Sequence, residues 1–241
     1  MKKTFLLSCL MLAAMPVMAA YTGHVYVDKN KNGVFDQSEK PLAGIKVSDG
    51  LNVVETAADG SFTLPGHERE RFIFITTPSG YKTFNRHYHK IEKKQSGYDF
   101  GLIPYSGRIR KDGSHRYIHI TDTEIFNTEN HEDWVNNVRD YARNEQAAFI
   151  IHTGDICYEK GLKAHIKLMN TENMDCPVFY CIGNHDLVKG KYGEELFESI
   201  YGPVYYSFDA GNVHYVVTPM SGGDHAPGYT SDDVCRWLKN D

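Results

Sequence analysis

The chain has 241 residues, of which 41% are hydrophobic and 12% aromatic, so it can bury one or two substantial cores. Its formal net charge is −5 and it contains no basic stripe, which argues against a nucleic-acid partner. No apolar stretch is long enough to span a membrane comfortably as a helix, so we expect no transmembrane segment.

Residues 1–20 have the order of a secretory signal peptide. Lys2 and Lys3 precede an apolar stretch and then small residues, with cleavage expected after Ala19 or Ala20. Cleavage would remove two lysines and no acidic residue, which shifts the net charge from −5 to −7. We therefore expect an exported protein, periplasmic or extracellular in a bacterium.

Residues 21–105 have the pattern of short strands and turns. The expected strands are GHVYV (23–27), GIKVSDG (44–50), NVVET (52–56), SFTLP (61–65), RFIFITTP (71–78) and YDFGLIP (98–104). Asp59-Gly60 between two apolar runs is a strong hairpin signal. The pattern predicts a small all-β sandwich domain of prealbumin-like size. A linker is expected over residues 106–116, which are rich in glycine, serine and charged residues.

Residues 117–241 alternate strand and helix patterns. The apolar runs YIHI (117–120), AFII (148–151) and VFYCI (178–182) are expected to be strands buried on both faces. Asn130 can cap an intervening helix whose apolar face is expected to carry Trp134, Val138, Tyr141 and Ala142. A second helix would use Leu162, Ile166 and Met169. The alternation predicts parallel βαβ units and hence an α/β domain. VYYSF (204–208) and VHYVV (213–217) are expected to pair antiparallel.

Polar side chains follow each of the three predicted parallel strands: Asp122 and Glu124 after the first, Asp155 after the second, and Asn184, His185 and Asp186 after the third. The carboxyl ends of neighbouring parallel strands meet at one edge of a sheet, so these residues should gather there. Crowded carboxylates repel each other unless a cation lies between them. Carboxylate, amide and imidazole groups are all metal ligands, so the pattern predicts a divalent-metal site.

The motifs TDTE (121–124), GDICY (154–158) and GNHD (183–186) resemble, in their order and spacing, the strand-end motifs of the calcineurin-like metallophosphoesterase family. The resemblance covers residues 117–241. The pieces GHV, GIKVSDG and TAADGSF also resemble the module that precedes this fold in some exported bacterial phosphoesterases. The resemblance implies a layered α/β domain that hydrolyses phosphomonoester or phosphodiester bonds. The implied substrate is a phosphorylated small molecule, a nucleotide or a lipid headgroup.

The resemblance also implies a role for each strand-end residue. Asp122 would bind the first of two divalent ions (Mn, Fe or Zn), Asp155 would bridge both, and Asn184 would bind the second. His185 would face the substrate and stabilise charge or protonate the leaving oxygen, and Asp186 would hold the far nitrogen of its imidazole.

Two features depart from the family pattern. Glu124 stands where the family usually has histidine; it would either ligate through oxygen, favouring Mn or Mg over Zn, or point away. The family's later histidine and closing G-H-x-H do not occur, so we expect the domain to be the amino-terminal part of a carboxy-terminally truncated phosphoesterase domain. These departures keep an alternative open, a non-catalytic exported binding protein with a degenerate phosphoesterase domain and a calcium-steadied β domain.

DKNKNGVFDQSE (28–39) fits the calcium-loop template D-x-N-x-N-G-x₅-E without a gap. The ligands would be Asp28, Asn30, Asn32, the Val34 carbonyl, Asp36 and Glu39. The helices that flank an EF-hand are absent, and the competing interpretation is a polar turn that binds nothing. Asparagine and aspartate at alternate positions favour calcium.

Overall fold

The computed structural model describes residues 20–67, 69–93, 95, 97–105, 108–129, 131–156 and 158–241. The expected signal peptide up to residue 19, the expected helix cap at Asn130 and the start of the expected linker at 106–107 lie outside these residues. Within the described part of the chain, no helix has the length and apolar character needed to cross a membrane.

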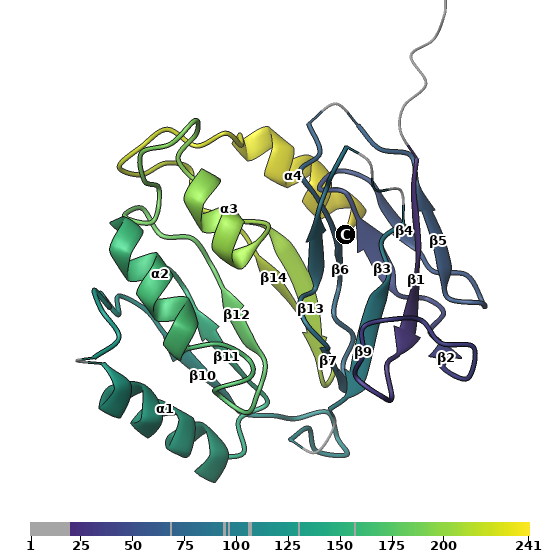
Figure 1. The fold of residues 1–241 in the computed structure, drawn as a ribbon, viewed down its shortest axis with the longest axis horizontal. Coiled ribbons are helices and arrows are strands. Elements are labelled where there is room, and N and C mark those ends of the chain that lie inside the picture. Colours follow the sequence, from purple (N-terminus) through teal and green to yellow (C-terminus); the bar gives the residue numbers. More distant parts are fainter. Residues whose placement is uncertain are drawn as a thin grey trace, which may run out of the picture.

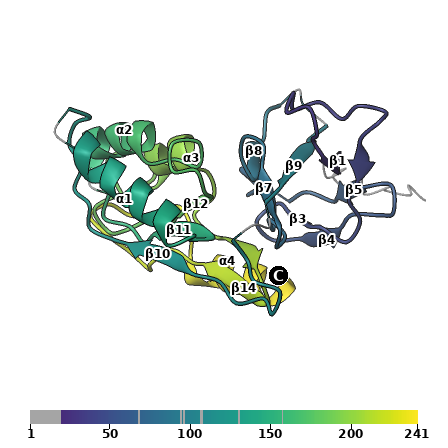
Figure 2. The ribbon, with the colours of Figure 1, turned by 90° about the horizontal axis from the view of Figure 1, so that it is seen from below.

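The amino-terminal region consists of two β-sheets packed face to face (Figures 1 and 2). The first sheet has the order β2-β1-β9-β7 with β5 also paired to β1; its bounds are β1 Tyr21–Val27, β2 Lys40–Pro41, β5 Ser61–Leu64, β7 Tyr81–Thr83 and β9 Phe100–Pro104. The second has the order β4-β3-β6-β8, with β3 Lys46–Ser48, β4 Val53–Glu55, β6 Phe72–Ile75 and β8 Tyr88–Lys90. Side chains from both sheets, such as Val25 and Val47, share one core. The arrangement agrees with the predicted all-β sandwich.

The carboxy-terminal region contains the predicted parallel sheet. Its order is β10 (Tyr117–Ile120), β11 (Phe149–His152) and β12 (Val178–Tyr180), with both pairings parallel. The remaining elements are α1 Glu132–Asn144, α2 Tyr158–Leu168, α3 Glu195–Tyr201, β13 Tyr206–Ala210, β14 Val213–Val217 and α4 Ser231–Asn240. Figure 2 shows α1, α2 and α3 on one face of this sheet and the antiparallel β13–β14 pair with α4 on the other. The predicted βαβ order is confirmed.

Helix α1 packs through only part of the predicted face. Of the predicted residues, Ala142 is buried and Val138 is partly buried against the core, whereas Trp134 and Tyr141 are 39% and 60% exposed. Val135, which was not predicted, is buried instead. The centre of the packed face is therefore shifted from the predicted one, because periodicity alone does not say which flank of the stripe meets the sheet.

The two domains share a buried aromatic cluster. Phe72, Phe74 and Tyr88 of the sandwich pack with Phe149, Phe179, Tyr206, Phe208 and Trp237 of the α/β domain. Phe179 stacks on Phe208 with ring centroids 3.6 Å apart. The Thr77 carbonyl accepts a hydrogen bond from the Asp209 N–H at 2.8 Å, so the β13 edge is joined directly to the sandwich. The domains form one packed unit.

The described part of the expected linker is also structured. Residues 109 and 115 form a β-bridge, and the Arg110 N–H donates to the Ser114 carbonyl within the turn between them. The Arg108 guanidinium donates to the Ala147 carbonyl at 3.0 Å, and His115 Nε2 lies 2.7 Å from the Tyr215 hydroxyl. Residues 108–116 are therefore hydrogen-bonded to the α/β domain.

Candidate active site at the strand ends

Two aspartates are presented by left-handed backbone at neighbouring strand ends. Asp122 has φ 53° and Asp155 has φ 51°, a region that aspartate enters more readily than most residues but that still carries strain. The Asp122 N–H donates to the Gly154 carbonyl at 3.1 Å, which ties the segment after β10 to the end of β11. The segments that carry the first two predicted metal ligands are therefore hydrogen-bonded to each other.

Close backbone contact joins the second strand end to the third. A Cβ atom on Gly154, whose φ is 96°, would lie 2.4 Å from the Gly183 nitrogen. A Cβ atom on Gly183 would lie 2.2 Å from Asp155 Oδ1. Only glycine fits at either position. Because Asp155 Oδ1 also accepts a hydrogen bond from the His185 N–H at 3.1 Å, Asp155 is fixed beside the segment that carries Asn184 and His185.

The His185 imidazole is held by Asp224. Its Nδ1 lies 2.8 Å from Asp224 Oδ2, in a surface pair whose side chains are 38% and 41% exposed. The hydrogen bond to Asp224 is the main cause that raises the pKa of His185, and the charges of Asp224, Asp155 and Asp186 act in the same direction. A carboxylate only accepts hydrogen bonds, so Nδ1 carries a proton and Nε2 is the nitrogen that can face a ligand.

The position of Asp186 differs from the prediction. Asp186 is buried, and its Oδ2 accepts a hydrogen bond from the Gly183 N–H at 2.9 Å, so it braces the turn after β12. The Nδ1 partner of His185 is instead Asp224, whose own N–H donates to the Asn184 carbonyl at 3.1 Å. Orientation of the imidazole is therefore assigned to Asp224. Sequence reasoning missed this residue, although the Gly222-Gly223-Asp224 run was a local signal for a loop that approaches other backbone.

His152 links the β11 end to the segment that carries Asp122. Its Nδ1 accepts from the Gly154 N–H at 3.2 Å, so the proton resides on Nε2, which lies 3.0 Å from the Thr123 hydroxyl. Burial lowers the pKa of His152 to about 4, which keeps the ring neutral at neutral pH. His152 thus positions both the Gly154 turn and the Thr123 segment.

The chemistry of the gathered side chains fits divalent cations. Asp122, Asp155 and Asn184 offer carboxylate and amide oxygens, which suit hard ions such as Mn or Mg. Glu124 is exposed with φ 44°, and its ligation stays a prediction. Within the residues that the structure describes, these side chains do not place three carboxylate, imidazole or thiolate ligand atoms within 4.8 Å of one another. Any bound ion would therefore need further ligands from Asn184, water or substrate.

One group that does meet this distance lies in the β domain. Asp49, His67 and Glu70 bring ligand atoms within 4.8 Å of one another, which makes them a candidate cation site. The Asp49 carboxylate already accepts hydrogen bonds from the Leu51 and Asn52 backbones and from the Asn52 amide. The Glu70 carboxylate accepts from Tyr21 and from the His67 N–H. The carboxylates of Asp49 and Glu70 are therefore already hydrogen-bonded to N–H and O–H groups of the protein.

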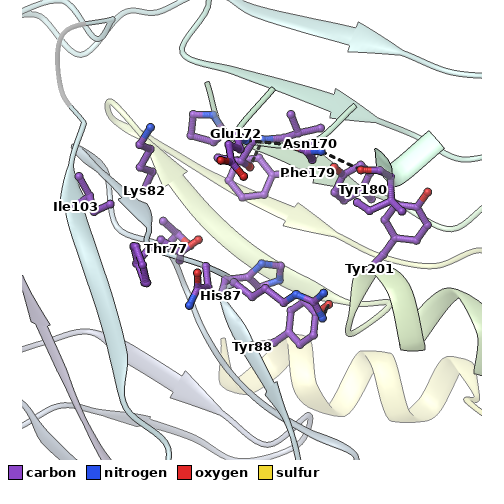
Figure 3. Close-up of a pocket in the computed structure, with 18 of the residues that line it drawn as sticks. Thr77, Lys82, His87, Tyr88, Ile103, Asn170, Glu172, Phe179, Tyr180 and Tyr201 are labelled. Atoms are coloured by element: carbon purple, nitrogen blue, oxygen red, sulfur yellow. Dashed lines mark hydrogen bonds between the residues drawn. The ribbon is translucent and has the colours of Figure 1, made fainter. Parts of the chain in front are cut away.

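The strand-end site is open at the surface rather than enclosed. A cavity of about 650 Å³ lies elsewhere, between the domains (Figure 3). In Figure 3, Lys82 and His87 of the sandwich face Asn170, Phe179 and Tyr180 across it, and none of the predicted site residues lines it. Asp122 and Asp224 are exposed, and Asn184 and His185 are half-buried. A ligand can therefore reach the strand ends directly from solvent.

Comparison with protein families agrees with this geometry. A model described as "Calcineurin-like phosphoesterase" matches residues 115–234, and one described as "N terminal of Calcineurin-like phosphoesterase" matches residues 29–104. The chain belongs to the calcineurin-like phosphoesterase family. The family predicted from the strand-end motifs is thus confirmed, whereas a prealbumin-like character of the β domain is not. Membership implies metal-dependent phosphoester hydrolysis and divalent ions in general. A search of curated proteins found no match.

Proposed function

We propose that the protein is an exported phosphoesterase that hydrolyses phosphomonoester or phosphodiester bonds at a dinuclear metal site on the strand ends. The proposal is supported by the contacts that join the strand ends carrying Asp122, Asp155 and Asn184, including the close approach of Gly154 to Gly183. Family membership supports the reaction class. The order of residues 1–20 supports export to the periplasm or the extracellular space.

Each strand-end side chain has a role that its position supports. Asp122, Asp155 and Asn184 would hold the two ions, with Asp155 between them. When bound, such ions supply a hydroxide nucleophile and neutralise phosphoryl charge. Asp224 keeps a proton on His185 Nδ1 and favours the imidazolium form, so that Nε2 can donate to a phosphoryl or leaving-group oxygen. Asp186 and His152 keep the surrounding turns in place.

The open position of the site bears on the substrate. Because Asp122 and Asp224 are exposed to solvent and Asn184 and His185 are half-buried, the strand ends admit a terminal phosphate on a larger group as readily as a small ester. A phosphorylated small molecule, a nucleotide or a lipid headgroup all meet this condition. We therefore propose the phosphoryl group itself as the recognised element.

The test replaces the proposed bridging carboxylate. Asp155→Asn keeps the shape of the side chain and its acceptor for the His185 N–H, but removes the charge between the ions. We expect the full chain, loaded with Mn, to lose bound metal and to hydrolyse an aryl phosphate and a bis-aryl phosphate at least about 10²-fold more slowly. Metal content by plasma mass spectrometry and release of the aryl alcohol measure the two effects.

The matched control is Asp140→Asn, which removes one carboxylate from the exposed surface of α1 and should leave metal content and turnover unchanged. Undiminished turnover in Asp155→Asn would exclude the bridging role. Metal binding by the wild-type chain without hydrolysis of either ester would reject the enzyme and favour the alternative of a non-catalytic binding protein.

A further inference from the structure

The segment from Asp28 to Glu39 adopts the turn geometry of a cation-binding loop. It connects β1 to β2, and Gly33, the sixth residue of the template, has φ 72°, as the sharp turn at that position requires. Asp28 Oδ2 accepts from the Gly33 N–H at 2.9 Å, and Oδ1 accepts from the Asn32 N–H at 3.3 Å. The first half of the loop therefore curls around its first carboxylate.

The two ends of the loop bury carboxylates. Asp28 is 1% and Glu39 6% exposed. Among the described residues, no lysine, arginine or histidine nitrogen lies within 4.0 Å of either carboxylate. Glu39 accepts only backbone N–H groups, from Lys29 at 2.8 Å and Asp36 at 3.2 Å. Two buried anions without a cation are unfavourable unless a positive charge binds between them.

A second and independent observation comes from Tyr26, which lies on β1 two residues before Asp28. Its side chain is fully buried and its ring stacks on Phe35 of the loop, with centroids 4.8 Å apart. Its hydroxyl has no hydrogen-bond partner among the described residues. A water molecule on a cation bound in the loop would give this buried hydroxyl a hydrogen-bond partner.

The middle of the loop supplies the remaining oxygens. Asp36 Oδ2 accepts from Nδ2 of Asn30 at 2.7 Å and from Nδ2 of Asn32 at 3.0 Å, so these three side chains already meet. An amide presents either its oxygen or its nitrogen after a rotation of its terminal bond. If the amides of Asn30 and Asn32 rotated, their oxygens and the Asp36 carboxylate would therefore be available to bind one cation.

We propose that residues 28–39 bind one calcium ion. The ligands are the side chains of Asp28, Asn30, Asn32, Asp36 and Glu39 and the carbonyl of Val34. An all-oxygen set on a flexible loop favours calcium over zinc, which prefers nitrogen and sulfur, and over magnesium, which demands a rigid octahedron. With three carboxylates, the expected dissociation constant lies between about 10⁻⁵ and 10⁻³ M.

Calcium at this loop would steady one wall of the interdomain cavity. Lys31 lines that cavity, and a Cβ atom on Gly33 would lie 3.2 Å from the Phe84 ring of the segment after β7. The loop lies between β1 and β2 of the sandwich, whereas the strand-end site follows β10, β11 and β12 of the α/β domain, and none of the strand-end residues lines the cavity. The calcium proposal therefore stands apart from the proposed hydrolysis.

The experiment is a titration of the full, metal-stripped chain with Ca²⁺ followed by calorimetry, and with Tb³⁺ followed by tyrosine-sensitised emission. We expect a saturable site in the wild type that is distinct from the strand-end site, competition between the two ions, and a higher melting temperature in calcium than in chelator. Tyr26→Phe should reduce the sensitised emission if the bound ion lies above that ring. Glu39→Gln should weaken calcium binding at least about 10-fold. Asp155→Asn should leave this site unchanged.

Glu55→Gln on the exposed edge of β4 is the matched control and should bind calcium like the wild type. Glu39→Gln keeps an acceptor for the Lys29 N–H, and its circular dichroism spectrum checks that it is folded. If Glu39→Gln proves unfolded, the titration of the wild type still tests whether the chain binds calcium. No saturable calcium binding up to about 10 mM would overturn the proposal. So would equal affinity in folded Glu39→Gln, or loss of the site in Asp155→Asn, which would place the ion at the strand ends.

Discussion

The domain interface consists mainly of buried aromatic side chains, whereas the strand-end site consists mainly of exposed charged side chains. The interface buries aromatic rings such as Phe179 and Trp237 almost completely. The strand ends expose carboxylates, hold Asp122 and Asp155 in left-handed backbone, and require glycine where two turns touch. The first region buries apolar area, which stabilises the fold. The second region brings carboxylates of like charge near one another. This arrangement lowers the stability of the fold and is suited to binding a cation.

The two regions are expected to control different properties of the molecule. If stability lies in the aromatic interface and cation binding lies in the strand-end turns, substitutions in the two regions should separate the two properties. Loss of a ring at the interface should lower the free energy of unfolding without changing the site in molecules that remain folded. Loss of a glycine at the site should impair metal binding strongly and lower the free energy of unfolding less.

The largest expected effect on stability is that of Trp237→Ala. Trp237 is fully buried on α4, with ring centroids 6.2 Å from Phe74 of the sandwich and 5.2 Å from Tyr205. We expect the free energy of unfolding to fall by about 3–5 kcal/mol in urea denaturation. Metal content per folded molecule should not change. Leu238→Ala on the exposed side of α4 is the control, with an expected change within about 0.5 kcal/mol.

Two outcomes for Trp237→Ala would contradict a separation of stability from metal binding. A loss no larger than that of Leu238→Ala would mean that the interface does not stabilise the fold. A loss of metal by the folded variant, in proportion to the loss of stability, would mean that the strand ends depend on the same packing.

Gly183→Ala is expected to have a smaller effect on stability and a larger one on the site. Its Cβ atom would lie 2.2 Å from Asp155 Oδ1, so that carboxylate must move. We expect a loss of about 1–3 kcal/mol in unfolding free energy, with metal content and aryl phosphate hydrolysis nearly abolished. The control is Gly222→Ala, where a Cβ atom meets nothing within 4 Å. Retention of metal by Gly183→Ala would contradict the role given to this contact.

The sequence was sufficient to predict the parts of the fold that depend on local pattern. Near-continuous apolar runs separated by helical periods predicted β10, β11 and β12 as parallel strands, and the residues after them as neighbours. These predictions succeed because strand alternation and the edge where strands end are consequences of chain order. The contact between Asp155 and the His185 segment follows from the same geometry.

The sequence was not sufficient where long-range packing decides. Asp186 is adjacent to His185 and was expected to orient it, yet the Gly183 N–H binds its carboxylate, and Asp224 reaches the imidazole from a distant loop. The contacts of Arg108 and His115 with the α/β domain could likewise not be read from the composition of this segment, which predicts only a linker. Such contacts depend on which surfaces meet, and no periodicity encodes that.

The smallest expected effect concerns the charged margin of the interface, where Glu198 of α3 is buried beside Arg71. The single guanidinium lies 2.8 Å from both Glu194 and Glu198, and Tyr192 donates to Glu198 at 3.2 Å. Burial, together with the neighbouring carboxylate of Glu194, raises the pKa of Glu198 to about 7, although Arg71 opposes the shift. One cation serving two buried carboxylates therefore favours a protonated Glu198 in the folded protein.

The sign of the pH dependence follows from this shift. The folded pKa lies above the ordinary value of 4.5, so the folded state binds the extra proton and its stability falls as pH rises from about 4.5 through 7. Glu198→Gln stays neutral and should lack this decline, by a difference on the order of 1 kcal/mol between pH 4.5 and 8. Urea denaturation across this range measures it, with Glu195→Gln as a control that removes one charge from the same helix. A wild type that instead gains stability over Glu198→Gln as pH rises would show that the ion pair with Arg71 outweighs burial, and that the interface is held by charge as well as by aromatic packing.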